Sequence, residues 1–210
     1  MIPIEPEAVD KAIGDFLRRG DAESRSALAS TGEAGLRRIL LLSQRADAFP
    51  DDGTISRLSG RDAIDQWTAA VAILAESAPE AYIEYASGRT LDSTEVSILG
   101  GVRHPGATEI LCREAVNSDW GIRYNAIRSL IRGADPAGRD CIEAALADEN
   151  VVVRSVAIKA VSRWDPQRAV GLYESLLQAE GLTPLLRQQA TWAIGELTAG
   201  RPVRDPLDPI

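Results

Sequence analysis

This sequence of 210 residues has very few histidines and cysteines, the side chains most often used for nucleophilic catalysis and zinc binding. His104 is the only histidine, and Cys112 and Cys141 are the only cysteines. A zinc site needs three or four such ligands close together, so these three do not suggest one. No nucleophile motif accompanies His104, which we interpret as a surface residue in a turn between helices. The sequence therefore predicts no catalytic residue, no metal and no cofactor.

The two cysteines lie 29 positions apart, each within a segment of periodic apolar residues. This separation predicts that they lie on neighbouring helices of one layer, whose axes are about 9 Å apart. A disulfide bond needs Cα atoms within about 7 Å of each other. We therefore expect Cys112 and Cys141 to be two buried free thiols.

Carboxylates gather between residues 47 and 65, where they suggest a site for a hard cation. Their spacing does not match an EF-hand loop, which has ligands at alternate positions and a closing glutamate. We interpret residues 47–60 as a solvated acidic loop, with the last two aspartates near the positive end of a helix that begins near residue 61. The residues concerned are Asp47, Asp51, Asp52, Gly53, Asp62 and Asp65.

A better candidate site lies on three predicted helices. Arg128, Lys159 and Trp192 follow one another at offsets of 31 and 33 positions, on the helix side opposite the apolar residues that would face a core. Arginine and tryptophan are enriched at binding hot spots. The alternative is an ordinary solvated helix surface. The predicted partner-binding residues are Tyr124, Arg128, Arg132, Ser155, Lys159, Arg163, Gln188 and Trp192.

The offset of 31 positions belongs to an internal repeat, in which residues 122–130 return as residues 153–161. Each copy has a polar residue six positions before its arginine, Asn117 in the first and Asp148 in the second. A period of this length is typical of a solenoid, in which stacked units complete one another's core.

Helix starts are recognisable because a capping residue precedes a proline at Asp135-Pro136, Asp165-Pro166 and Thr183-Pro184. Together with apolar residues spaced by three and four positions, these signals predict an all-α chain. The expected helices span residues 5–19, 21–30, 32–45, 61–77, 79–88, 92–102, 106–116, 120–132, 136–147, 150–163, 166–179 and 184–198.

The repeat with Asp148, Val153-Arg154 and Ala157-Ile158 on the second helix of a hairpin resembles a HEAT repeat. The segment with Asn117 and Ile122-Arg123 resembles a variant of it. The resemblance implies a right-handed, armadillo-like α-α superhelix of about six antiparallel helix pairs. It also implies a polar ladder between successive repeats, formed here by Asn117, Arg123, Asp148 and Arg154.

We expect a single HEAT-like domain over residues 1–198, with the clearest repeats at 106–198, and an extended proline-rich tail over residues 199–210. The N-terminus lacks a basic region followed by an apolar core, and no stretch approaches 18 apolar residues, so we expect a cytoplasmic protein with no membrane association. The 21 arginines against 2 lysines suggest a bacterial source. The oligomeric state is not predicted.

The net charge of −8 disfavours general binding of nucleic acid. We therefore predict a non-catalytic scaffold that binds another protein through the concave face of its inner helices. An immunity or antitoxin-type binder of a basic toxin is one version, and a regulatory binder is another. The resemblance leaves a HEAT-like DNA glycosylase acting on alkylated bases as the alternative, and that enzyme would need a basic groove with an aromatic residue and a carboxylate. No residue supports a chromophore-lyase or lipid-handling role.

Overall fold

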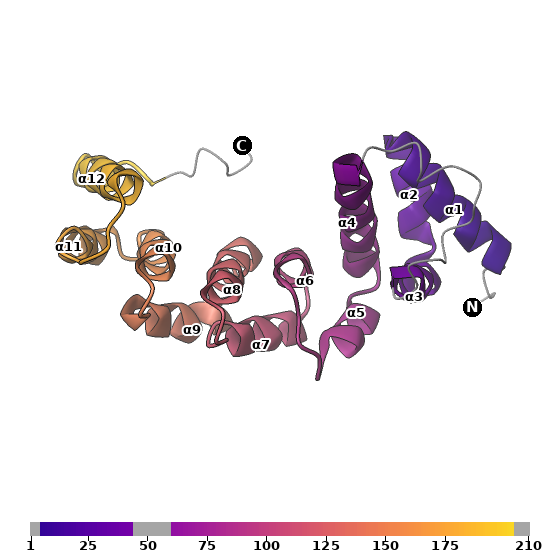
Figure 1. Cartoon of the computed structure of the whole chain (residues 1–210), viewed down its shortest axis with the longest axis horizontal. Coiled ribbons are helices and arrows are strands. Elements are labelled where there is room, and N and C mark those ends of the chain that lie inside the picture. Colours follow the sequence, from indigo (N-terminus) through magenta and orange to yellow (C-terminus); the bar gives the residue numbers. More distant parts are fainter. Residues whose placement is uncertain (1–4, 44–59, 204–210) are drawn as a thin grey trace. The chain divides into compact units, whose positions relative to one another are not determined.

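The computed structural model describes residues 5–43 and 60–203, and these form helices without any strand (Figure 1). The prediction of an all-α chain is confirmed, and the predicted helix ranges agree with the observed ones to within a few residues. The helices are α1 (Pro6–Arg19), α2 (Ala22–Ser30), α3 (Gly32–Ser43), α4 (Gly60–Ser77), α5 (Pro79–Ala86), α6 (Ser93–Leu99), α7 (Pro105–Glu114), α8 (Trp120–Gly133), α9 (Arg139–Ala144), α10 (Val151–Val161), α11 (Pro166–Leu176) and α12 (Pro184–Thr198), with short 3₁₀ helices at Pro136–Gly138 and Ala145–Ala147.

The chain divides into two compact units, Met1–Ala107 and Thr108–Ile210. The first unit contains α1 to α6, and the second contains most of α7 and all of α8 to α12. The division falls close to residue 106, where the recognisable repeats begin.

In the first unit, α1, α3 and α4 pack around a core that includes Phe16, Leu36 and Leu74. An ion pair at the surface joins two of these helices, because the Arg38 guanidinium donates to both carboxylate oxygens of Asp10 at 2.6 and 2.9 Å. The first unit is thus held by an apolar core and a two-point contact between α1 and α3.

In the second unit, α8, α10 and α12 lie in one layer, and α9 and α11 lie in another (Figure 1). The Ala-Ile pairs of the repeat, Ala126-Ile127 and Ala157-Ile158, are buried between the layers. A core cluster at the C-terminal end adds Tyr173 of α11 and Ala193 of α12. The repeated apolar residues therefore form the core of the second unit, which leaves the opposite sides of α8, α10 and α12 exposed.

The prediction of two free thiols is wrong, because Cys112 of α7 and Cys141 of α9 form a disulfide bond with their Cα atoms 5.5 Å apart. The cysteines do lie on neighbouring helices. The error was to compare the distance between helix axes with the limit for Cα atoms. Each Cα lies about 2.3 Å from its helix axis, so facing residues on helices about 9 Å apart approach to within about 5 Å.

Reduction of the disulfide is expected to lower the free energy of unfolding by about 3.5 kcal/mol, because the bond closes a loop of about 30 residues that contains all of α8. The measurement is urea unfolding followed by circular dichroism, with and without dithiothreitol. The control is Cys112→Ser/Cys141→Ser, which should match the reduced wild type and not respond to dithiothreitol. Two titratable thiols in the untreated, folded wild type would contradict the bond.

Candidate partner-binding surface

Arg123 connects the turn before α8 to the turn before α10. Its side chain is 8% exposed, and its Nε and Nη2 atoms donate to the Asp148 carboxylate at 2.7 and 2.9 Å. Its Nη1 atom donates to the carbonyl oxygens of Asn117 and Ser118 at 2.9 and 3.2 Å. One guanidinium therefore fixes the N-terminal ends of α8 and α10 side by side.

Asp148 is the acceptor in this pair, and its side chain is 7% exposed. Burial alone raises the pKa of the Asp148 carboxyl, but hydrogen bonds from Arg123 and from the Asn150 amide, the latter at 2.7 Å, together with the positive charge of Arg123 lower the pKa by more. The pKa consequently lies below its ordinary value, and the carboxylate is charged at neutral pH.

The other two residues of the predicted ladder make different contacts. The Arg154 Nη1 atom donates to the carbonyl oxygens of Asp148 and Glu149 at 2.7 and 3.2 Å, in the turn of its own repeat. The Asn117 side chain donates to Glu114 at 2.9 Å, so it shapes its own turn and only its carbonyl contacts Arg123. The arginine-to-turn contact thus recurs, while the Asp148 carboxylate serves the arginine of the preceding repeat.

Arg123→Ala is expected to lower the free energy of unfolding by about 3 to 5 kcal/mol, because it leaves the buried Asp148 carboxylate without its cation. Arg154→Ala is the matched control and should cost about 1 kcal/mol, because Arg154 donates only to neutral carbonyl oxygens in the turn of its own repeat. Chemical denaturation of both variants checks this. Equal losses of unfolding free energy in the two variants would show that the ion pair of Arg123 and Asp148 contributes no more than the carbonyl contacts of Arg154.

The stability contributed by Asp148 should depend on pH. Because its folded pKa lies below the unfolded value of about 3.9, the contribution is complete above about pH 5 and is lost as the pH falls through the folded pKa. The difference in unfolding free energy between wild type and Asp148→Asn should therefore shrink between pH 5 and pH 2. A difference that stays constant over this range would contradict the lowered pKa.

The predicted binding residues of α8 lie on its exposed side. Arg128 is exposed and Tyr124 is partly exposed. The Arg128 guanidinium carbon lies 5.6 Å from the centre of the Tyr124 ring, in a cation–π contact. Arg132, in the last turn of α8, is also exposed. We call the exposed side of α8, α10 and α12 the repeat face; it contains all eight predicted binding residues.

On and beside α10, Ser155 and Lys159 are partly exposed, and Arg163 is exposed. The Ser155 hydroxyl donates to the Val152 carbonyl at 2.8 Å, so it serves its own helix. The Arg163 Nη1 atom donates to the Ile131 carbonyl in the last turn of α8 at 3.2 Å. This bond shows that the C-terminal ends of α8 and α10 are adjacent, as their N-terminal ends are.

On α12, Gln188 and Trp192 are exposed, and Trp192 keeps 47% of its surface in solvent. The only carboxylate of this helix, Glu196, accepts bonds from Arg201 at 2.8 and 2.6 Å. Since α10 contacts both α8 and α12, the eight predicted residues lie on three neighbouring helices.

The repeat face is positively charged although the whole sequence has a net charge of −8. Helices α8 and α10, residues 120–133 and 151–161, contain no aspartate or glutamate. Arg132 and Lys159 stand in the last turns of these helices, where cations offset the partial negative charge of the helix end. Apart from Glu196 of α12, which is paired with Arg201, the carboxylates of the second unit occur in turns and in the other layer, as with Glu143, which pairs with Arg168 at 2.7 Å.

Sequence reasoning missed two apolar side chains at the N-terminal edge of the repeat face. Trp120, the first residue of α8, is 49% exposed, and Leu185 of α12 is 62% exposed. The repeat offsets did not reveal them, because Trp120 aligns with Val151 and Pro184 and not with Leu185; the signal was a large apolar residue in the first turn of its helix, outside the core pattern.

The remaining candidates from the sequence do not assemble a second site. His104 lies in the turn between α6 and α7, where its Nδ1 atom accepts a bond from the Gly106 amide at 3.0 Å. Asp65 is exposed on α4. Asp47, Asp51, Asp52, Gly53 and the side chain of Asp62 lie outside the described residues. Within residues 5–43 and 60–203, no three histidine, cysteine or acidic side chains are placed to hold a metal ion.

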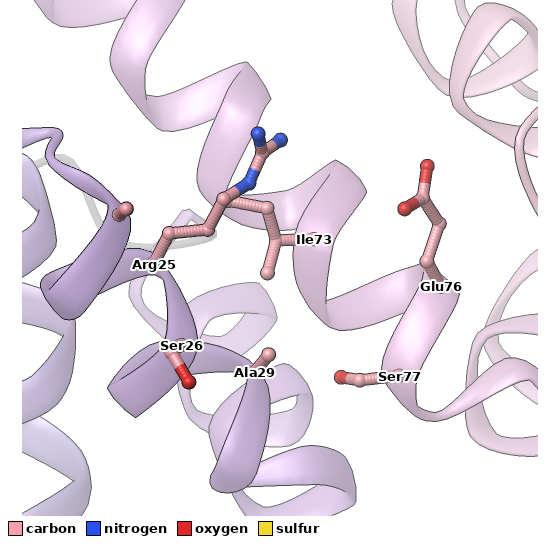
Figure 2. A pocket seen from close by; sticks show the side chains of 7 residues that line it. Arg25, Ser26, Ala29, Ile73, Glu76 and Ser77 are labelled. Atoms are coloured by element: carbon pink, nitrogen blue, oxygen red, sulfur yellow. The ribbon is translucent and has the colours of Figure 1, made fainter.

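A shallow, open depression of about 380 Å³ lies between α2 and α4 in the first unit (Figure 2). Arg25 extends toward Ile73, and Glu76 and Ser77 come from α4. The Ser77 hydroxyl donates to the Leu74 carbonyl at 3.0 Å, so it is not prepared as a nucleophile. The rest of the lining consists of the small side chains of Ala22, Ser26 and Ala29.

The sequence matches no protein-family model, and no curated protein is significantly similar to it. Among the helices of the described residues, none has the length and apolarity required to cross a membrane.

Proposed function

We propose that this protein is a HEAT-like α-solenoid of about six antiparallel helix pairs and that it serves as a non-catalytic scaffold. It binds another protein through the repeat face, which would be the concave side of such a solenoid. One observation carries the proposal: Arg128, Lys159 and Trp192 occupy equivalent positions on three neighbouring helices whose opposite sides form the core.

Trp192 has enough exposed surface to anchor a partner. An indole ring buries about 200 Å² when fully covered, so the exposed half offers about 100 Å². At about 25 cal/mol per Å², covering it yields roughly 2.5 kcal/mol. This is the range that defines a hot spot in a protein interface.

The charge of the repeat face bears on the kind of partner. Helices α8 and α10 carry only positive charges, which suits an acidic partner and a regulatory role. An immunity-type protein that covers a basic toxin would need a different surface, such as the first unit, which has 17 acidic and 11 basic residues. The repeat face therefore favours the regulatory version of the scaffold.

A DNA glycosylase would use the same positively charged helices to bind DNA, but it also needs a carboxylate at the damaged base. Of the carboxylates described near the repeat face, Glu196 is held by Arg201, and Asp148 is held by Arg123. Both are occupied by strong charge-assisted bonds that would have to break before either could act as a base. These contacts favour the scaffold over the enzyme.

The cytoplasmic location and the bacterial source stay predictions. The Cys112–Cys141 bond weighs against the cytoplasm, because disulfides persist mainly in oxidising compartments. In a reducing cytosol the same cysteines would be thiols, and the second unit would lose the stabilisation estimated above.

Trp192→Ala and Arg128→Glu/Lys159→Glu are both expected to abolish capture of the partner from the source cell. For Trp192→Ala, the loss of binding free energy should be at least about 2 kcal/mol. The double charge reversal should change the free energy of unfolding by less than about 1 kcal/mol, because Arg128 and Lys159 lie outside the core, whereas Trp192→Ala should lower it by roughly 2 kcal/mol, because about half of the indole surface is covered in the fold. The measurements are thermal unfolding and quantitative mass spectrometry of the captured proteins.

Arg25→Glu/Arg103→Glu is the matched control, because it changes the net charge equally at two exposed arginines of the first unit. It should capture the partner as the wild type does. Melting several degrees lower in Arg128→Glu/Lys159→Glu would mean that these two residues support the core. Release of bases from alkylated duplex DNA above the spontaneous rate would replace the scaffold with the glycosylase.

A further inference from the structure

The repeat face changes in character along the helices. At the N-terminal edge, Trp120 and Leu185 are exposed, and Val152 lies partly exposed on the helix between them. About two turns further on, seven or eight residues along the same helices, the side chains are those of Arg128, Lys159 and Trp192. The face thus has an apolar edge beside a row of two cations and a tryptophan.

The spacing of this row follows from helix packing. Neighbouring packed helices have axes about 9 to 10 Å apart. The N-terminal and C-terminal contacts of Arg123 and Arg163 hold α8 and α10 parallel and in register, so Arg128 and Lys159 are separated by about this distance. Trp192 follows on α12, which also contacts α10. The apolar edge lies about 10 to 12 Å from the row, since the seven or eight residues between them rise about 1.5 Å each.

We propose that the occupant of the repeat face is an acidic amphipathic helix of the partner protein, lying across α8, α10 and α12. A helix rises about 10 Å in seven residues, and its positions i and i+7 share one side. Carboxylates seven residues apart would meet Arg128 and Lys159, and an apolar residue seven positions further on would cover Trp192. The inference rests on the proposed function and specifies the chemistry of the partner.

The apolar edge gives the bound helix its orientation. Apolar side chains along the flank of the helix would cover Trp120 and Leu185, which otherwise stay in water. A flexible acidic chain could neutralise the cations but would gain little from this edge. The combination of charge and apolar surface therefore favours an amphipathic helix over an unstructured acidic segment.

Two other occupants fit less well. Nucleic acid has regularly spaced phosphates, which need a continuous row of cations. On the repeat face, exposed Trp192 follows the two cations, and Trp120 and Leu185 are exposed beside them. A second copy of the chain would have to supply the carboxylates, and no two acidic residues in this sequence are seven positions apart. Both remain measurable outcomes of the test below.

The overall negative charge does not prevent this binding. At physiological ionic strength, charges more than about 8 Å away are largely screened, so an approaching carboxylate responds mainly to the cations it touches. Within α8 and α10 there is no carboxylate to repel it. The attraction is local and should weaken as salt is added.

The test uses two fluorescein-labelled helical peptides of 21 residues in an alanine and glutamine background. The in-phase peptide has glutamates at positions 1, 4, 8 and 11 and leucines at positions 15 and 18, all on one side. The control peptide has the same composition with the glutamates at positions 3, 6, 10 and 13, which turns them away from the leucines. Fluorescence anisotropy measures both against the full-length, oxidised protein.

We expect the in-phase peptide to bind at least tenfold more tightly than the control peptide. Arg128→Glu/Lys159→Glu should weaken this binding at least tenfold, Trp192→Ala should weaken it measurably, and Arg25→Glu/Arg103→Glu should leave it unchanged. Raising the salt from 50 to 300 mM should also weaken it. Equal binding of the two peptides, or no binding of either, overturns the proposal.

Further outcomes identify what replaces it. A 20-base-pair duplex that binds more tightly than the in-phase peptide and requires Arg128 and Lys159 would assign the face to nucleic acid. A dimer in sedimentation equilibrium that the double charge reversal dissociates would assign it to a second copy. If neither peptide binds while Trp192→Ala still abolishes partner capture, the scaffold function is supported and only the proposal of an acidic helix as its partner is wrong. If both Trp192→Ala and Arg128→Glu/Lys159→Glu still capture the partner, the proposed scaffold function of the repeat face is wrong.

Discussion

The buried pair of Arg123 and Asp148 is the contact on which the arrangement of the repeat face depends. A guanidinium and a carboxylate taken out of water are stable only when their remaining hydrogen-bonding groups are also satisfied, and here turn carbonyls and the Asn150 amide satisfy them. This requirement admits one register of α8 against α10. The positions of Arg128 and Lys159 relative to each other follow from that register.

The other layer of the second unit is joined by different means. The Cys112–Cys141 bond links α7 to α9, and the Arg168–Glu143 pair links α9 to α11. The exposed pair contributes about 1 kcal/mol at most, so the covalent bond is the stronger constraint. Reducing it would leave α7 and α9 joined by packing alone, while Arg123 and Arg163 would still hold α8 and α10 in register.

The sequence contained most of the helix boundaries because proline and a capping residue mark them locally, as at Thr183-Pro184, where the Thr183 hydroxyl accepts a bond from the third helical amide. The disulfide depends on which sides of two helices face each other, and a helix rotates about 100° per residue, so counting residues leaves that undetermined. The partner of Asp148 was also ambiguous, because arginines of both its own repeat and the preceding one lie within reach of its turn.

Cations and apolar residues on the repeat face do not carry equal information about function. Arg132 and Lys159 stabilise the C-terminal ends of their helices, so their presence is accounted for by folding alone. Trp192, Trp120 and Leu185 each leave about half or more of their surface in water, at a cost that full burial would have avoided. Large apolar side chains retained at three places on one face are therefore the stronger sign of a partner, and the cations beside them define which partner the face would select.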